Sequence, residues 1–387
     1  MLPRTLGLGG GIAVAVGSVA GSGILFLPSV IYVVAGSDAL VVWVLAALVC
    51  VPLLLVFGAL VRRVPDGSGL EGFVALGLGR RVAALVPLLL LIVFFPAMAA
   101  AMLVAGGYVG DGVVQLAVAL SIIAVTTFGA LAGARGAARL QVVVVWTMLV
   151  AALLLVVVTV PRAWDGYDAV APRFSDFGAI AGGVLVAFWG FAGFENMTFV
   201  AGELKNPRRD YLIAVAVALG GYCLLAMLLT ANLGAIVPRS QVDELTGVAQ
   251  LASYTPAGPV IAVLAVLLVQ AGASSWVWGV SRLLYSAARE GRMPAWFAAV
   301  DARGVPRRAV LCLVVPGAIA TCVAAVWPGL VLPFVTFASG VFVFLYALAV
   351  ASFIRVRRAA RAARSRTRLP DRSPPGRPPA AESRARS

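Results

Sequence analysis

The chain has 387 residues, of which 62% are hydrophobic and 12% are charged, and it carries a formal net charge of +14. Soluble globular domains are only about 45 to 50% apolar, so this composition excludes them and indicates a polytopic membrane protein. The chain contains no histidine, which excludes His-ligated metal sites and catalysis by a histidine base.

The apolar runs are too long for the strands of about ten residues that form a membrane β-barrel, so we predict an all-α fold. Runs bounded by charged or turn residues predict ten spans, at residues 7–35, 39–61, 82–109, 112–131, 140–160, 178–202, 211–237, 258–285, 309–327 and 329–354. Basic residues are concentrated in alternate loops, whereas the opposite loops hold only Arg162, Arg173 and Arg239. The positive-inside rule therefore predicts a multi-pass protein of the cell membrane with both termini in the cytoplasm, and it explains the charge without a nucleic acid partner.

The first predicted span has Gly21-Ser22-Gly23 at its middle. A helix break at membrane depth is tolerated only where the freed backbone groups face protein, water or a ligand. If the chain unwinds from Val19 to Gly21, the amides of Ser22, Gly23 and Ile24 begin a second half-helix, whose positive dipole end is an anion site. The alternative is that the small residues only allow close packing against another helix.

The sixth predicted span is also interrupted, between residues 188 and 196. Halves of five spans each have opposite orientations, and Gly-interrupted helices at corresponding positions indicate the central site of a transporter. Glu195 is the only ionisable residue that the predicted boundaries place well inside a span. We favour a functional role for Glu195 over a neutral carboxyl that is hydrogen-bonded for packing. Trp189 either fills space or covers the site as a flat lid.

The loops and the C-terminal region show three further patterns. Residues 66–80 and 286–306 contain short apolar stretches that predict interfacial or re-entrant helices. Residues 355–387 are rich in Arg and Pro and predict a disordered cytoplasmic tail. The arginines of this tail either lie on anionic lipid or only fix topology and solubility.

Three segments resemble motifs of the amino acid/polyamine/organocation (APC) superfamily, namely residues 21–28, residues 188–195 with 203–210, and residues 282–306. The stretch 203–210 is most similar to that of the bacterial methionine and branched-chain amino acid exporters. The resemblance implies a transporter core over residues 1–354 with a leucine-transporter-like inverted repeat of five plus five helices, the repeats covering about 7–160 and 178–354. Relatives commonly have twelve helices, so the tail in place of the last two leaves the oligomeric state open.

The resemblance also implies a binding site for an amino acid. The amides of Ser22, Gly23 and Ile24 would bind its carboxylate, and carbonyls near Val19, Trp189 and Ala192 would bind its ammonium group. Trp189 would gate the outer side. The substrate side chain would face a largely apolar wall, which favours aliphatic or thioether side chains and comprises Phe95, Met98, Phe191, Trp276 and Thr336.

The resemblance further suggests that Lys205 contributes to a cytoplasmic gate, although a basic residue at this position needs no role beyond orientation. The coupling ion is open, and no other cofactor is expected. Ser274 and Ser275 of the eighth span could supply hydroxyls to a sodium site, whereas Glu195 could carry a proton. We favour proton-linked efflux or exchange of neutral amino acids.

An importer of the same fold and a non-transporting amino acid sensor are the alternatives. A membrane enzyme is not supported, because the sequence offers no convergent nucleophile, base or metal set. The expected partners are therefore an amino acid and the lipid bilayer.

Overall fold

The computed structural model describes residues 6–19, 21–63, 69–132, 137–200 and 204–367. This part of the chain is almost entirely helical and forms no named β-strand. The α-helices are α1 (Leu8–Val19), α2 (Gly23–Ala35), α3 (Ala39–Val61), α4 (Gly69–Leu78), α5 (Arg80–Ala83), α6 (Leu85–Gly107), α7 (Val113–Ala132), α8 (Ala137–Ala163), α9 (Phe177–Phe191), α10 (Met197–Val200), α11 (Pro207–Ile236), α12 (Gly247–Ser253), α13 (Gly258–Arg289), α14 (Arg307–Val326) and α15 (Val331–Thr367).

Eight segments of the described chain are long and apolar enough to cross a membrane. They are Gly23–Val61, Arg80–Gly107, Val113–Ala132, Val143–Val170, Arg209–Ile236, Gly258–Arg289, Arg307–Val326 and Pro328–Arg361. The first of these joins the second half of the first predicted span to the second predicted span. The sixth predicted span is represented by Phe177–Phe191, which is shorter than the others. The count of ten spans therefore stays a prediction.

Each of the main pairs of packed helices has a matching pair, in which both helices are replaced by their counterparts from the other half of the chain. α1 packs on α11, and its counterpart α9 packs on α3. α6 packs on α14 and α15, and its counterpart α13 packs on α7 and α8. This is the contact pattern that an inverted repeat with a pseudo-two-fold axis produces.

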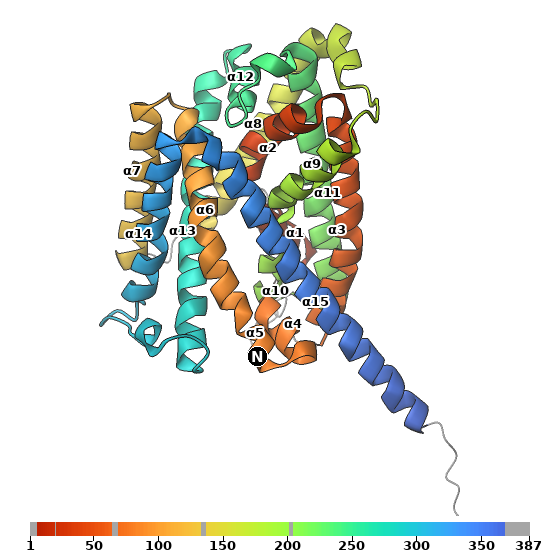
Figure 1. Cartoon of the computed structure of the whole chain (residues 1–387), viewed down its shortest axis with the longest axis vertical. Helices are drawn as coiled ribbons and strands as arrows, with labels where there is room; N and C mark the ends of the chain where they lie inside the picture. Colours follow the sequence, from red (N-terminus) through yellow and green to blue (C-terminus); the bar gives the residue numbers. More distant parts are fainter. Residues whose placement is uncertain (1–5, 20, 64–68, 133–136, 201–203, 368–387) are drawn as a thin grey trace, which may run out of the picture.

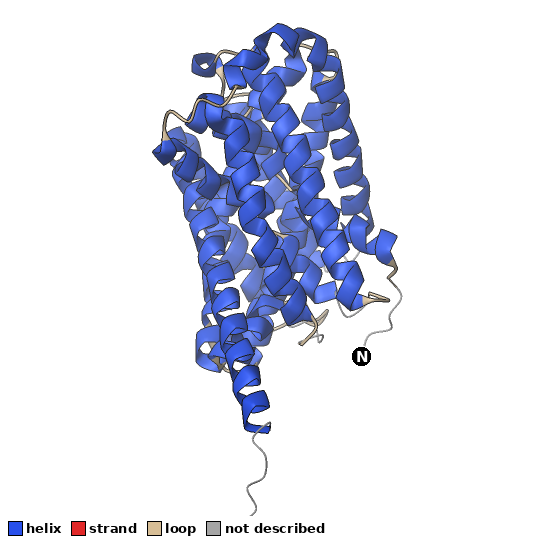
Figure 2. Ribbon diagram, turned by 90° about the vertical axis from the view of Figure 1, so that its right-hand side faces the viewer, coloured by secondary structure: helices blue, strands red, loops and turns tan. Residues whose placement is uncertain are grey.

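The helices run mostly along the long axis of the molecule, as Figure 2 shows. α6, α7, α13 and α14 lie on one side, α3 and α11 lie on the other, and α15 crosses in front of the bundle (Figure 1). α4, α5 and the last turns of α15 lie at the same end of the molecule, opposite α12 (Figure 1). We call this end the basic face, because Arg80 and Arg81 belong to α5 and Arg355, Arg357 and Arg358 to the end of α15.

The C-terminal helix is longer than expected. α15 continues through Thr367, past residue 354, where the sequence analysis places the start of a disordered tail. Residues 355–364 consist mostly of Arg and Ala, which are strong helix formers, and this explains the extension. Of the two segments with predicted short helices, 66–80 contains α4, whereas 286–306 begins with the last residues of α13 and then forms a 3₁₀ turn at Ala295–Ala298.

Asp38, between α2 and α3, fixes the loop that leads into α9. Its Oδ1 atom accepts the N–H groups of Arg173 (2.7 Å) and Phe174 (2.8 Å), and its Oδ2 atom accepts that of Ser175 (3.1 Å). Phe174 has a φ of 52°, a backbone conformation that residues other than glycine rarely adopt. The three bonds from one buried side chain hold this loop in place.

We expect Asp38→Ala to lower the midpoint of thermal unfolding by several degrees, because the three amides lose a charged acceptor. The measurement is thermal unfolding of the purified protein in detergent. Asp111→Ala, at an exposed acidic residue before α7, is the matched control. Equal midpoints for the two variants would show that the Asp38 bonds do not stabilise the fold.

Candidate functional site

The first broken helix consists of α1 and α2. α1 ends at Val19 and α2 begins at Gly23. Between them, the Gly21 amide donates a hydrogen bond to the Val19 carbonyl at 2.8 Å. At the start of α2 the amide of Ile24 lies 3.5 Å from the Gly21 carbonyl and that of Leu25 lies 3.0 Å from the Ser22 carbonyl, which leaves the amides of Ser22 and Gly23 nearest the break. The predicted interruption of the first helix is confirmed.

The second broken helix consists of α9, a 3₁₀ turn named η3 (Phe194–Asn196) and α10. After Phe191 the chain becomes extended at Ala192, with φ −63° and ψ 140°. Gly193 follows with a φ of 112°, in the left-handed region that favours glycine. The predicted interruption of the sixth helix is also confirmed.

The two breaks lie against each other. Gly193 is so close to the carbonyl oxygen of Ser18 that a Cβ atom would collide with it. Gly23, the first residue of α2, faces Gly190 of α9, since its Cβ would lie 3.2 Å from the Gly190 Cα. The same Cβ would lie 2.7 Å from the hydroxyl of Tyr222 on α11. Glycines therefore allow both broken helices to cross at their interruptions.

We expect Gly23→Ala to displace α2 from α9 and to reduce ligand binding at least tenfold, since small misplacements at such a site have large effects. Gly9→Ala is the matched control, because Gly9 lies near the start of α1 and a Cβ atom there meets nothing within 4 Å. Binding of labelled amino acids to the purified variants measures the difference. If both variants bind as the parent does, the close contact of α2 with α9 is not required.

Trp189 and Phe191, the two predicted site residues at the end of α9, point in different directions. Trp189 is half-buried, and its ring packs edge-to-face on Phe26 of α2, with a centroid distance of 5.8 Å. Phe191 is fully buried between Trp43 of α3 and Tyr222 of α11, at 6.4 and 5.9 Å. The structure thus brings Trp189 to the first broken helix and places Phe191 in a neighbouring aromatic cluster.

The residues predicted for the substrate wall are not brought together by their described contacts. Met98 packs on α14, where a Cβ atom at Gly317 would lie 2.6 Å from the Met98 methyl group. Trp276 contacts Phe342 of α15 at 6.1 Å. The Thr336 hydroxyl bonds to a carbonyl of its own helix, and Phe95 is half-buried on α6.

The serines predicted for a sodium site lie on α13. The Ser274 hydroxyl donates to the Gln270 carbonyl at 2.9 Å. The Gln270 side chain in turn donates to the Thr126 hydroxyl on α7 at 2.8 Å, and Ser275 is exposed. The described contacts of Ser274 therefore run toward α7 rather than toward the end of α1.

The Lys205 side chain is exposed, and its backbone amide donates to the Leu6 carbonyl at 2.9 Å. In a cytoplasmic gate, Lys205 could pair with Glu203, Asp210 or Glu290. Glu203 lies outside the described residues. Asp210 accepts the backbone amide of Asn206 at 3.2 Å, and the carboxylate of Glu290 pairs with an arginine of its own loop.

Glu195 lies in η3 and is 6% exposed. Its Oε2 atom accepts the Gly193 amide at 2.8 Å and the Tyr346 hydroxyl at 2.7 Å. The bond to Tyr346 connects the second broken helix to α15. The sequence analysis did not identify Tyr346, nor Tyr222 and Tyr211 on α11. A hydroxyl inside an apolar span is the only signal that could have found them.

α4 is tied to two distant parts of the chain at the basic face. The Ser352 hydroxyl on α15 donates to the Phe73 carbonyl on α4. Arg292, which follows α13, pairs with Glu71 on α4 and with Glu290. α4 also packs on α10 of the second broken helix.

Asp301 closes the loop before α14. Its Oδ1 atom accepts the amides of Val305 and Arg303, both at 2.9 Å, and its Oδ2 atom lies 2.8 Å from Arg307 Nε. These contacts hold the pKa of Asp301 below its ordinary value, and the hydrogen bond from the Val305 amide contributes most. The charged form is favoured by folding, so this contribution to stability is present above the ordinary pKa and is lost as the pH falls below it.

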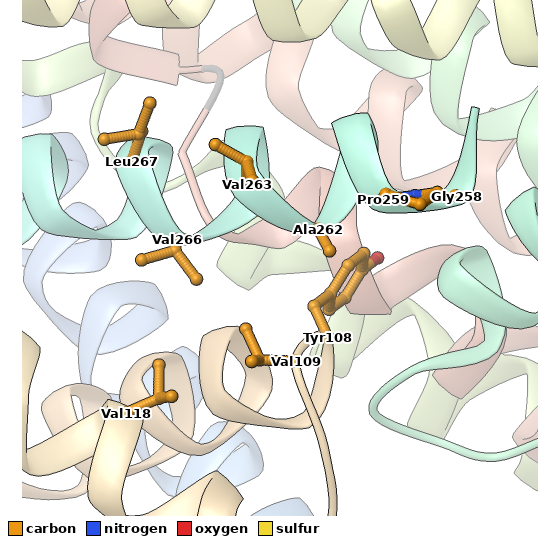
Figure 3. Close-up of a pocket in the computed structure, with 9 residues that line it drawn as sticks. All are labelled: Tyr108, Val109, Val118, Gly258, Pro259, Ala262, Val263, Val266 and Leu267. Carbon is orange, nitrogen blue, oxygen red and sulfur yellow. The ribbon is translucent and has the colours of Figure 1, made fainter.

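A separate apolar pocket of about 630 Å³ lies between the end of α6, α7 and the start of α13 (Figure 3). Its lining comprises Tyr108, Val109, Val118, Gly258, Pro259, Ala262, Val263, Val266 and Leu267. Val109 and Val263 are more than half exposed, so the pocket opens to the outside of the bundle. None of the predicted site residues lines it. The Tyr108 hydroxyl donates to the Leu25 carbonyl in the first turn of α2 at 2.6 Å.

Two interrupted helices that cross within an inverted repeat define a membrane transporter of the leucine-transporter-like type. The chain belongs to the amino acid permease family, whose model matches residues 6–379. This confirms the resemblance to the APC superfamily.

Relatives of the chain are named as transporters rather than enzymes. The L-methionine/branched-chain amino acid exporter YjeH of Escherichia coli is 30% identical over 230 residues, which cover 56% of this chain and 53% of the exporter. An uncharacterised transporter of Mycobacterium tuberculosis is 31% identical over 341 residues, or 84% of this chain and 74% of the relative. The cadaverine/lysine antiporter of Escherichia coli is 23% identical, covering 80% and 72%.

A solved structure of a Na⁺-coupled sialic acid symporter matches with a TM-score of 0.56 and 13% identity, covering 83% of this chain and 74% of the symporter. At this identity the likeness shows the fold alone.

Proposed function

We propose that the protein is a secondary active transporter that moves neutral amino acids by alternating access. The contact between the two helix breaks, where Gly193 meets the Ser18 carbonyl and Gly23 meets Gly190, supports this proposal most directly. Helix ends of opposite polarity meet there, and such ends bind small charged groups in transporters with broken helices. We place the protein in the cell membrane with the basic face toward the cytoplasm.

The substrate is held as a zwitterion. The start of α2 presents backbone N–H groups and a positive dipole end, which suit the α-carboxylate. The end of α1 presents carbonyls around Val19, and Ala192 begins the extended segment after α9; these carbonyls suit the α-ammonium group. No ionised side chain is required for either contact.

The expected substrates are branched-chain amino acids and methionine. Trp189 and Phe26 contribute aromatic surface beside the first break, and they offer no charge to a cationic or acidic substrate side chain. The name of the Escherichia coli exporter states the same substrate class, which is consistent with this assignment. Transport is proton-linked efflux or exchange, with Glu195 as the proton carrier.

Liposomes that contain the purified protein and are preloaded with unlabelled leucine or methionine test this function. We expect labelled leucine and methionine to accumulate by counterflow, and lysine and glutamate to compete at least tenfold less well. An imposed pH gradient should drive net flux, and replacement of sodium by choline should not change it. Ligand binding without counterflow would indicate a sensor instead. Net flux toward the basic face under physiological gradients would indicate an importer.

A further inference from the structure

The hydroxyl of Tyr222 is a buried polar atom without a hydrogen-bond partner among the described residues. Tyr222 is 3% exposed and lies near the middle of α11. Three of the five buried tyrosines, Tyr32, Tyr108 and Tyr346, donate their hydroxyls to protein oxygens. Buried polar groups are rarely left unpaired in folded proteins, so the Tyr222 hydroxyl indicates a partner that is not part of the chain.

This hydroxyl lies where the two broken helices cross. It is 2.7 Å from the position that a Cβ atom of Gly23, the first residue of α2, would occupy. A Cβ atom at Gly190, in the last turn of α9, would collide with the same hydroxyl. Because a carbon–carbon bond at Cα is about 1.5 Å long, the Gly23 Cα lies no more than about 4.2 Å from this oxygen. The hydroxyl therefore lies beside the backbone at the start of α2 and at the end of α9.

The ring of Tyr222 is held in this position by two aromatic neighbours. Its centroid lies 6.2 Å from that of Trp43 on α3 and 5.9 Å from that of Phe191 on α9, and both contacts are edge-to-face. Trp43 and Phe191 are 0% exposed. A side chain that is already fixed by packing loses little further conformational freedom when its polar atom binds a ligand. The hydroxyl is therefore preorganised at the crossing.

The groups beside the hydroxyl suit an anion. The amides of Ser22 and Gly23 lie nearest the first break, since those of Ile24 and Leu25 have carbonyl partners at 3.5 and 3.0 Å. Free amides and the positive dipole end at the start of a helix favour a negative charge. A tyrosine hydroxyl can donate a strong hydrogen bond to a carboxylate, whose two oxygens accept about four such bonds. The start of α2 thus has two amides and one hydroxyl as donors for one carboxylate.

We propose that the Tyr222 hydroxyl donates a hydrogen bond to the α-carboxylate of the bound amino acid, beside the amides of Ser22 and Gly23. α11 then contributes a substrate-binding residue in addition to those of the two broken helices. A site built to hydrogen-bond one group of its substrate selects against analogues that lack this group. Tyr222 therefore favours amino acids over the corresponding amides and amines. This inference rests on the proposed function.

Tyr222→Phe tests the proposal, because it removes only the hydroxyl and keeps the ring between its aromatic neighbours. The loss of a hydrogen bond to a charged group should raise the Kd of leucine at least tenfold. The midpoint of thermal unfolding without ligand should not fall, since the hydroxyl has no partner among the described residues. Equilibrium binding of labelled leucine and thermal unfolding, both with the purified protein in detergent, measure the two effects.

Tyr211→Phe is the matched control. Tyr211 lies on the same helix, is 0% exposed, and has a hydroxyl without a partner among the described residues. It precedes Tyr222 by eleven residues, which is about 16 Å along an α-helix. We expect its Kd for leucine to equal that of the parent.

Two further measurements separate a contact with the carboxylate from a general distortion of the site. Leucinamide keeps the ammonium group and the side chain of leucine but has no carboxylate, so its Kd should change less than twofold in Tyr222→Phe. The carboxylate stretch of bound leucine that carries ¹³C in its carboxyl group, recorded by infrared difference spectroscopy, should shift in Tyr222→Phe and not in Tyr211→Phe. If Tyr222→Phe does not fold, Tyr222→Met replaces it, because methionine fills irregular gaps.

A carboxylate stretch that stays at the parent's position in the Tyr222 variant overturns the inference, and the hydroxyl would then bind only water. A parent-like Kd for leucine, or an equal loss for leucine and leucinamide, also overturns it. Failure of the proposed function looks different, because the parent protein would then show no counterflow at all. Counterflow by the parent together with parent-like leucine binding in Tyr222→Phe would retain the proposed function and reject only the role of Tyr222.

Discussion

Replacing Gly193 by alanine is expected to reduce amino acid counterflow at least a hundredfold. Gly193 has a φ of 112°, and its Cβ would collide with the Ser18 carbonyl of the first broken helix. The backbone conformation alone costs a non-glycine residue about 1–3 kcal/mol. The collision must also push the two breaks apart, and a displacement of about 1 Å at a binding site can reduce its activity a hundredfold.

Gly182→Ala is the matched control for this prediction. Gly182 lies on α9 of the same broken helix, and a Cβ atom there meets nothing within 4 Å. Counterflow in liposomes and thermal unfolding in detergent should both be unchanged in Gly182→Ala, whereas Gly193→Ala should lose transport and unfold at a lower temperature. Normal counterflow in Gly193→Ala would contradict a binding site between the two breaks.

Glu195→Gln should make the flux of leucine independent of pH. Glutamine retains an oxygen that can accept the Gly193 amide and the Tyr346 hydroxyl, so the local structure is expected to persist. It cannot take up or release a proton in the working pH range, and it therefore removes the proposed carrier. Exchange of leucine for leucine needs no net proton movement and should continue at a rate within about threefold of the parent.

The measurement is leucine flux into liposomes over a range of external pH, with and without a pH gradient. Glu244→Gln, at an exposed residue of the loop before α12, is the control and should retain the parent profile. A Glu195→Gln protein whose flux still follows pH would exclude Glu195 as the proton carrier, while leaving the binding site of the two breaks intact.

The sequence predicted the two breaks because glycine and a carboxylate at membrane depth need a structural reason. Gly21-Ser22-Gly23 and Gly193 with Glu195 stand out against apolar spans, and both interruptions occur where these residues lie. The sequence predicted that basic segments gather on one side of the membrane. In agreement with this, α5 and the end of α15, which both contain arginines, lie at the same end of the molecule. These features depend on local composition, which a single sequence contains in full.

Side-chain directions could not be predicted in the same way. Phe191 and Trp189 are two residues apart at the end of α9, yet Phe191 faces α3 and α11 while Trp189 faces α2. Their directions depend on the helical phase where α9 unwinds. Tyr346 resembles other buried aromatic residues in sequence, and only the folded arrangement of α15 and η3 brings its hydroxyl to Glu195.

The position of α4 has a consequence for how the basic face opens. α4 is joined to α15 through Ser352 and Phe73, and to the loop after α13 through Glu71 and Arg292. A helix attached on both flanks cannot swing outward alone, so an exit route on this side requires the ion pair to separate first. Because both side chains of this pair are mostly buried, salt screens their attraction only weakly, and the balance between sealed and unsealed forms of the transporter should change little with ionic strength.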